Sequence, residues 1–282
     1  MGNKLSSRPR RNDPMATKLE QARKTGVLNL VASSLSPSSS TWSKIDVMSI
    51  KLIDISNNPL PHLPVEIYAM QNLKYVICFT YTKFVNSFRK LKCNHCQLES
   101  LYSAISNNGN LSHIEAEHNK LGQGLIGELP PSITHLSLAH NQFTCIHPSL
   151  HSSLNLLVLD LSGNQIQSLQ GIAMVISLTD LCLDDNLISE IPEEVSSLSK
   201  LKRISLKRNR IGSKAVTFDG QSIHESVFTD SNIESIDLEG NPIKKSTITN
   251  FNGVEAFLER RKKLKEKNLM MGASTDLELF GL

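Results

Sequence analysis

The chain has 282 residues, of which 39% are hydrophobic and only 5% aromatic, and its formal net charge at pH 7 is +3. This charge is too small to argue for nucleic-acid binding, and no apolar run reaches the roughly 18–20 residues of a membrane-spanning helix. Five cysteines, an odd number, and a start without the apolar core of a secretory signal favour a reduced, intracellular protein.

Residues 1–14 read as a disordered basic leader that carries a lipidation pattern. The opening MGNKLS places Gly2 and Ser6 as N-myristoylation requires. The cationic residues behind the acceptor glycine are Lys4, Arg8, Arg10 and Arg11. Since one myristoyl chain gives only marginal membrane affinity, the basic cluster supplies a second signal toward an anionic surface. The sequence predicts a cytoplasmic, lipid-anchored protein; an ordinary basic leader, or a start at Met15, is the alternative.

A short helical cap is expected at 15–25, and a repeat fills 26–249. Each full unit reads LxxLxLxxNxL, and the asparagines from Asn119 to Asn209 follow one another at steps of 22, 23, 22 and 23 residues. The complete set of structural asparagines is Asn58, Asn119, Asn141, Asn164, Asn186, Asn209 and Asn241. Such a period is typical of leucine-rich repeats, in which each unit adds one strand to a curved solenoid. We therefore predict an α/β fold with about nine units, a parallel concave sheet and helical caps.

Two intervals exceed the period. Asn58 and Cys96 are 38 residues apart, and Asn209 and Asn241 are 32 apart. The surplus is expected near 75–89 and near 213–229, looped out without breaking the stack. For the first segment, a structural loop and a gene-model error are equally open. Beyond the repeats, 250–267 reads as a basic helical cap and 268–282 as a flexible tail.

Histidines gather in two positions of the frame. His95, His118 and His140 each directly precede the asparagine position, and His113 and His135 share another position two residues after the first apolar residue. In the expected strand geometry both positions face the concave surface, together with Glu115. A metal-loaded surface or a pH-sensitive contact is possible chemistry there, and an ordinary solvated recognition face is the simpler interpretation.

Charges alternate by repeat farther along the same face. The residues are Asp180, Asp184 and Asp185 in one unit, Arg203, Lys207 and Arg208 in the next, and Asp237 and Glu239 in the last. Lys207 is expected to lie between Asp184 and Glu239. Much of this charge can pair within the protein at about 0–1 kcal/mol per exposed pair, and the remainder steers a partner of mixed charge. We predict a docking surface that includes Asp184, Asp185, Arg203 and Arg208.

No catalytic constellation is found in the sequence. Cys93 and Cys96 form a CxxC, but the frame places them in core positions and no second pair completes a zinc site. The chain has no P-loop, nucleophile elbow or HExxH helix. We expect neither an enzyme, nor a resident cofactor, nor a small-molecule substrate.

Three segments resemble the leucine-rich repeat-containing protein 57 family, small intracellular N-myristoylated proteins. They are MGN at the start, ARKTGVLNL before the first repeat, and LEGNPIKK with FNGVEAFLERRKKLKEK at the end, so that the resemblance runs from Gly2 to about Lys267. Departures are the longer basic leader and the two insertions. The resemblance implies an adaptor in the cytosol or at a membrane, in a signalling role with undefined protein partners. The competing hypothesis is a soluble repeat subunit of a ribonucleoprotein or enzyme complex, with its basic ends on RNA or an acidic partner.

Overall fold

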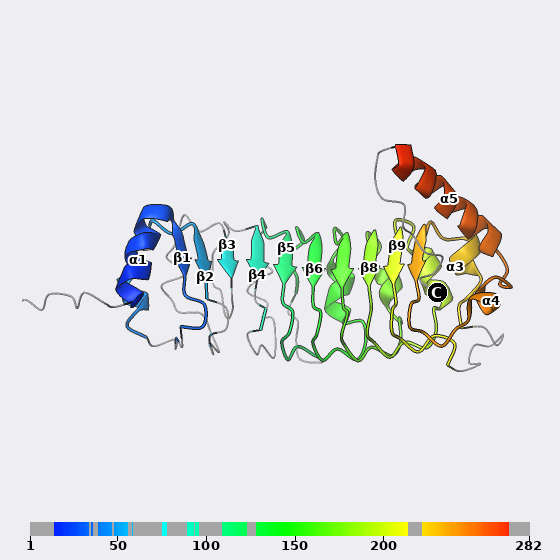
Figure 1. Cartoon of the computed structure of the whole chain (residues 1–282), viewed down its shortest axis with the longest axis horizontal. Helices are drawn as coiled ribbons and strands as arrows, with labels where there is room; N and C mark the ends of the chain where they lie inside the picture. Colours follow the sequence, from blue (N-terminus) through cyan, green and yellow to red (C-terminus); the bar gives the residue numbers. More distant parts are fainter. Residues whose placement is uncertain are drawn as a thin grey trace, which may run out of the picture.

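Ten short strands form one parallel sheet in chain order (Figure 1). The computed structural model describes residues 14–33, 35, 39–46, 48–55, 58, 75–77, 89–92, 94–95, 109–122, 128–213 and 222–270. The strands are β1 (Val27–Asn29), β2 (Leu52–Asp54), β3 (Tyr75–Ile77), β4 (Lys90–Lys92), β5 (His113–Glu115), β6 (His135–Ser137), β7 (Val158–Asp160), β8 (Asp180–Cys182), β9 (Arg203–Ser205) and β10 (Ser235–Asp237). The predicted parallel-sheet solenoid is confirmed.

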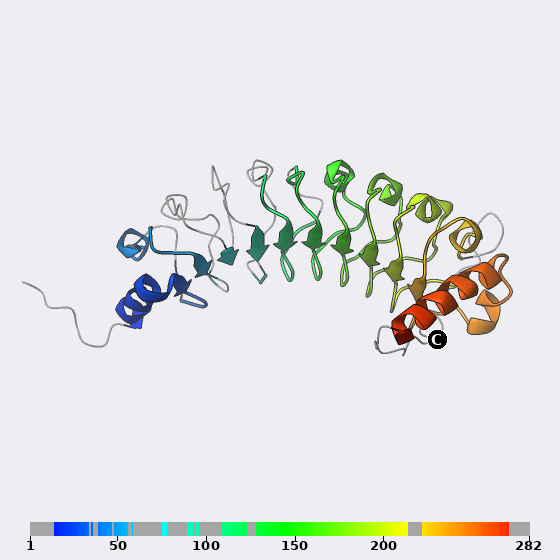
Figure 2. The ribbon, with the colours of Figure 1, turned by 90° about the horizontal axis from the view of Figure 1, so that it is seen from above.

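Helical segments cover the side away from the sheet and both ends (Figure 2). They are α1 (Pro14–Thr25), η1 (Trp42–Lys44), η3 (Pro148–Ser152), η4 (Ile172–Met174), η5 (Glu193–Ser197), α3 (Ser226–Thr229), α4 (Lys245–Ile248) and α5 (Val254–Met270). No helix among the described residues is both long and apolar enough to cross a membrane.

The apolar positions of the frame form the core. In the strands β4 to β8 the central residue is buried, as in Leu136, Leu159 and Leu181, which pair in register across β6, β7 and β8. The residues on either side of it are half-buried, because alternate side chains of a strand point to opposite faces of the sheet. Each of these repeats therefore presents two outward side chains on the concave face.

The asparagines hold successive turns together through their side-chain amides. Asn164 donates Nδ2 to the carbonyls of Leu161 (2.8 Å) and of Leu138 in the previous repeat (3.1 Å), and its Oδ1 accepts the N–H of Phe143 (3.0 Å). The same pattern recurs at Asn186 and Asn209. These amides satisfy backbone groups that would otherwise be buried without partners.

The expectation that 75–89 is entirely looped out is wrong. Tyr75–Ile77 forms β3, which pairs with β2 on one side and β4 on the other. Tyr75 follows Leu52 by 23 residues, a full period, and Lys90 follows Tyr75 by only 15. The long interval is thus a regular unit followed by a short one, so the sheet has ten strands where we expected about nine units. Residues 78–88 lie outside the described residues.

The second long interval, from Asn209 to Asn241, does not interrupt the sheet, since β9 and β10 pair directly. Residues 214–221 lie outside the described part, and the segment from Ser222 to α3 packs into the core. Ile223 forms a parallel bridge with Ile191, and Val227 and Phe228 of α3 are fully buried.

Both ends carry helices where caps are expected. α1 packs on β1 with Ala22 buried. α5 covers the last repeat through Phe257, whose ring meets Phe228 edge-on at 5.9 Å between centroids. Arg260 donates to the carbonyls of Phe228 (2.8 Å) and Ile233 (3.1 Å). Part of the basic sequence of α5 therefore closes the solenoid. The leader 1–13 and the tail 271–282 lie outside the described residues.

Candidate functional site: the concave face

The concave face of β4–β10, with the turn after each strand, brings together all fourteen residues that the sequence suggests for partner binding. Six lie in strands: His113, Glu115, His135, Asp180, Arg203 and Asp237. Eight lie in the turns after the strands: His95, His118, His140, Asp184, Asp185, Lys207, Arg208 and Glu239. Gly2, the basic leader residues Lys4, Arg8, Arg10 and Arg11, and the cysteines Cys93 and Cys96 fall outside the described residues.

Each turn contains a residue with a left-handed backbone just before the asparagine position. φ is +56° at His95, +54° at His118 and +53° at His140. Glycine adopts such angles freely, and asparagine, aspartate and histidine are enriched among the other residues that do. The recurrence of histidine at this position thus has a backbone cause, which the sequence spacing alone did not reveal.

The three turn histidines form a continuous ring stack. The centroids of His95 and His118 are 4.3 Å apart and those of His118 and His140 are 4.2 Å apart, with interplanar angles of 10° and 11°. The stack ends at Gly163, which has no side chain to continue it, and a Cβ there would lie only 2.3 Å from His140 Nδ1. Glycine at this turn leaves the space that the His140 ring occupies.

His113 and His135 form a second stack on the strands themselves, at 4.2 Å and 8°. The hydroxyl of Ser112 lies 3.2 Å from the carbonyl oxygen of Arg89 and 2.9 Å from His113 Nδ1. The hydroxyl of Thr134 likewise lies 3.0 Å from the Ser112 carbonyl oxygen and 2.9 Å from His135 Nδ1. Each ring is thus held through Nδ1 by the side chain of the residue before it.

Burial and neighbouring cations disfavour protonation of the stacked rings. Burial, His135 and Lys90 lower the pKa of His113 against a weaker opposing effect of Glu115. Burial and the flanking rings likewise lower the pKa of His118. At neutral pH His113 and His118 are therefore predominantly uncharged.

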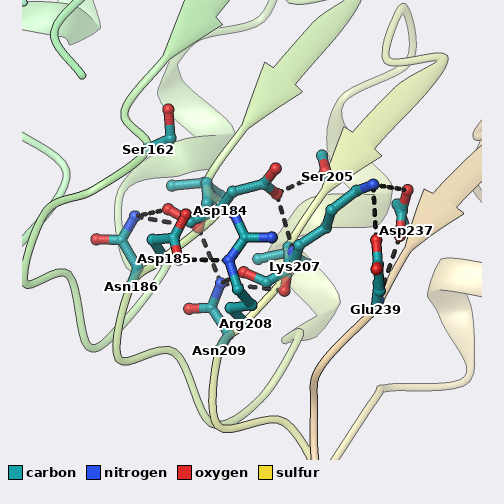
Figure 3. A network of polar contacts seen from close by, with 12 residues as sticks. Ser162, Asp184, Asp185, Asn186, Ser205, Lys207, Arg208, Asn209, Asp237 and Glu239 are labelled. Atoms are coloured by element: carbon teal, nitrogen blue, oxygen red, sulfur yellow. Dashed lines mark hydrogen bonds and ion pairs between the residues drawn. The ribbon is translucent and has the colours of Figure 1, made fainter. Parts of the chain in front are cut away.

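Ion pairs between neighbouring strands organise the charged half of the face (Figure 3). Arg208 holds Asp185 in a bidentate pair (2.6 and 2.5 Å), which lowers the pKa of that carboxyl. Lys207 Nζ lies 3.0 Å from both Asp237 and Glu239. Asp184 contacts Lys207 through the backbone N–H (2.8 Å), so Lys207 does lie between Asp184 and Glu239, as expected.

Three further ion pairs lie on this face, and two of them involve lysines, Lys90 and Lys92, that the sequence pattern did not point to. Arg203 pairs with Asp180. Glu115 accepts from Lys90 (2.6 Å) and Lys92 (2.5 Å); burial opposes ionisation of Glu115, but these hydrogen bonds outweigh it and lower its pKa. Lys90 and Lys92 lie on either side of the buried central residue of β4. Their positions in the repeat frame could therefore have predicted that they face the concave surface.

Two shallow hollows, of about 320 and 340 Å³, lie on this face. One is lined by residues of β7–β10, including Asp180, Cys182 and Arg203, and the other by residues from β4 to β7, including His113 and His135. Asp160 borders both. Burial raises the pKa of Cys182 to about 11, so its thiol stays protonated. An open surface of this kind, on which charged and histidine side chains border the hollows, suits a polypeptide partner better than an enclosed small ligand.

Within the described ranges, no three His, Cys, Asp or Glu side chains are grouped so that they could hold a metal ion.

Comparisons with known proteins agree with this architecture. A sequence profile described as "Leucine Rich repeat" matches residues 152–169. Lumican of Homo sapiens is 28% identical over 178 residues, which are 62% of this chain and 50% of lumican. Lumican of Bos taurus is 28% identical over 186 residues, 63% of this chain and 51% of that protein. The chain thus spans about half the length of these relatives.

Solved structures share the fold. A leucine-rich repeat protein of Leptospira interrogans superposes with a TM-score of 0.51 at 21% identity, over 79% of this chain and 56% of that one. An internalin (inlF) of Listeria monocytogenes does so with a TM-score of 0.54 at 16% identity, over 87% and 68%. The profile match covers β7 and Asn164, the part of the frame that recurs along the sheet, so the chain is similar in sequence and in fold to leucine-rich repeat proteins, which generally act as protein–protein interaction modules.

Proposed function

We propose that this protein is a non-enzymatic adaptor that binds partner proteins on the concave face of β4–β10. The observation that carries the proposal is the exposed array of charged and histidine side chains that parallel strands hold at fixed spacing across this face. Cross-strand ion pairs such as Arg208–Asp185 keep the side chains in defined positions before a partner arrives. Preorganisation of this kind reduces the entropic cost of association.

The docking surface is tested by proximity labelling in cells with the wild-type protein and with Arg203→Glu/Arg208→Glu. We expect this double variant to change its set of concave-face partners, because each reversal places two like charges together at Asp180 and Asp185 and breaks the cross-strand pairs that position these side chains. Lys200→Glu/Arg210→Glu changes the net charge equally at exposed positions away from the strands and should keep them. An unchanged set of partners in the first variant would refute the proposal.

We further propose attachment to the cytoplasmic face of a membrane through myristoylation of Gly2, as the resemblance to the leucine-rich repeat-containing protein 57 family implies. The MGNKLS start and the basic residues behind it support this, since a lipid and a cationic cluster together give stable attachment. A myristate analogue should label the full chain but not Gly2→Ala, and only the labelled protein should sediment with membranes at high salt. Absence of label on the full chain excludes the anchor.

The alternative is a soluble repeat subunit of a ribonucleoprotein or enzyme complex, using its basic ends. In α5, Arg260 is engaged with backbone carbonyls and Arg261 is buried, which leaves fewer cations for RNA. Nuclease-sensitive co-sedimentation of the full chain would favour this alternative over the adaptor.

A further inference from the structure

The charge of the concave face has the opposite sign to that of the chain. From the first residue of each strand β4–β10 to the residue before its asparagine position, the described residues include eight carboxylates and five cations. The carboxylates are Glu115, Glu117, Asp160, Asp180, Asp184, Asp185, Asp237 and Glu239, and the cations are Lys90, Lys92, Arg203, Lys207 and Arg208. The face is therefore net negative on a chain whose formal net charge is +3. Such segregation directs a cationic partner to this surface.

Three of these carboxylates are oriented by neutral donors. Glu117 accepts from the hydroxyl of Ser137 (2.9 Å). Asp160 accepts from the hydroxyl and the N–H of Ser162 (2.5 and 2.9 Å). Asp184 accepts from the hydroxyl of Ser205 (2.6 Å) and the N–H of Lys207 (2.8 Å). These bonds fix the carboxylates in position but leave their charge in place.

The strand histidines add acceptors along the same path. His113 and His135 line the hollow that Glu117 and Asp160 also line. Ser112 and Thr134 hold these rings through Nδ1, and in the tautomer in which Nδ1 donates to the hydroxyl, Nε2 is a hydrogen-bond acceptor. Guanidinium and ammonium groups only donate hydrogen bonds, so a row of carboxylates and neutral imidazoles matches them.

We propose that the concave face binds an extended arginine- or lysine-rich segment of a partner protein, with Glu117, Asp160 and Asp184 as its principal cation contacts. Glu117 follows β5, Asp160 lies in β7 and Asp184 follows β8. Consecutive members of this series are therefore two strands and one strand apart across the sheet, roughly 10 and 5 Å, which brackets the roughly 7 Å between alternate side chains of an extended peptide. This inference deepens the adaptor function proposed above and rests on it.

The histidines make this binding depend on pH. The charged groups around the strand pair are Lys90 from β4, Glu115 beside it, Glu117 after β5 and Asp160 from β7; Asp185 lies near the end of the turn stack at His140. Histidine side chains as a class gain protons between pH 7.5 and 5.0, whereas carboxylates as a class stay ionised over that range. Protonation turns acceptors into donors and adds positive charge, so a cationic segment is expelled.

The experiment uses the full chain and a fluorescent nona-arginine probe, followed by anisotropy at low salt, with nona-glutamate as the opposite probe. At pH 7.5 we expect nona-arginine to bind and Glu117→Gln/Asp160→Asn/Asp184→Asn to weaken it at least tenfold. The matched control, Glu128→Gln/Glu193→Gln/Glu194→Gln, removes three exposed carboxylates elsewhere and should change the affinity less than twofold. At pH 5.0 the wild-type protein should bind at least tenfold more weakly, and His113→Gln/His135→Gln should show a smaller loss.

Equal weakening by the two triple variants, or preference for nona-glutamate at pH 7.5, would overturn the proposal. Circular dichroism establishes whether each variant is folded. If the triple variant Glu117→Gln/Asp160→Asn/Asp184→Asn does not fold, the single variant Asp160→Asn takes its place, and we expect it to bind nona-arginine at least threefold more weakly than the wild-type protein. If nona-arginine fails to bind while Arg203→Glu/Arg208→Glu still changes the set of partners in cells, the adaptor function stands and the basic partner is excluded.

Discussion

At the scale of single residues, the asparagine side chain joins one turn of the solenoid to the next. Asn164 is 6% exposed and bonds to backbone groups of Leu138 and Phe143 in the previous repeat and Leu161 in its own. No other side chain of its size presents two amide donors and a carbonyl acceptor in this geometry. The side-chain amide thus links the backbones of two consecutive repeats by hydrogen bonds.

Asn164→Ala should lower the free energy of unfolding by about 2–4 kcal/mol, since several buried backbone groups lose their partner together. Urea unfolding followed by circular dichroism measures this loss. Asn155→Ala is the matched control, because Asn155 is exposed and makes a single bond to the Pro131 carbonyl (2.9 Å); its cost should stay below about 1 kcal/mol. Equal costs at both positions would show that burial of the amide is unimportant.

Residue positions were largely predictable from the repeat, but residue partners were not. The frame placed the asparagines inside and the fourteen candidate side chains on one surface, because side-chain direction follows from position in a strand. Ring stacking of His95 with His118 depends on a left-handed backbone at each turn, and pairing of Lys90 with Glu115 depends on which neighbour a flexible side chain reaches. Neither is determined by period alone.

At the scale of elements, β3 is the one strand that the asparagine spacing did not predict. This spacing measures whole units, so a shortened unit without an asparagine appears as an insertion. Tyr75–Ile77 nevertheless consists of aromatic and β-branched residues that favour strands, and it lies a full period after β2. Applying the period to strand positions as well would have revealed it.

The histidine stacks across β4–β6 and their turns should make stability fall as the solution becomes acidic. The native state lowers the pKa of His113 and His118, so the unfolded chain binds more protons once the pH drops below about 6.5. The free energy of unfolding then decreases with falling pH. Urea unfolding at pH 7.5, 6.5 and 5.5 measures the slope.

His113→Gln/His118→Gln should flatten that slope, whereas His224→Gln, changed away from the concave face, should leave it as in the wild-type protein. Glu115 affects the free energy of unfolding in a more acidic range of pH. Its pKa is lowered in the native state, so its contribution to stability is lost only as the pH falls below about 4.5. If the free energy of unfolding of both histidine variants changes between pH 7.5 and 5.5 as steeply as that of the wild-type protein, His113 and His118 are not the cause of the pH dependence.

At the scale of the whole molecule, the solenoid has two ends and α5 closes one of them. Without α5, the apolar surface of the last repeat around Phe228 and Ile233 would face water. A repeat protein depends on such caps for solubility because each unit contacts only its neighbours.

Phe257→Ala should therefore cost about 3–5 kcal/mol in urea unfolding, since the ring is fully buried against Phe228. It should also promote self-association, seen by sedimentation velocity. Lys262→Ala, at an exposed position of the same helix, should stay within about 0.5 kcal/mol of the wild-type value. A monomeric Phe257→Ala protein of unchanged stability would show that α5 is not the cap.

The left-handed turns limit how this surface can be redesigned. From His95 to Gly240, seven successive turns place a residue with positive φ directly before the asparagine position. β-branched side chains fit that backbone poorly. Substitutions at the turn position are therefore restricted, and glycine, asparagine, aspartate and histidine are the favoured residues. The strand positions beside it carry no such restriction. An engineer who wishes to retarget the protein should randomise the strand positions and leave the turns alone.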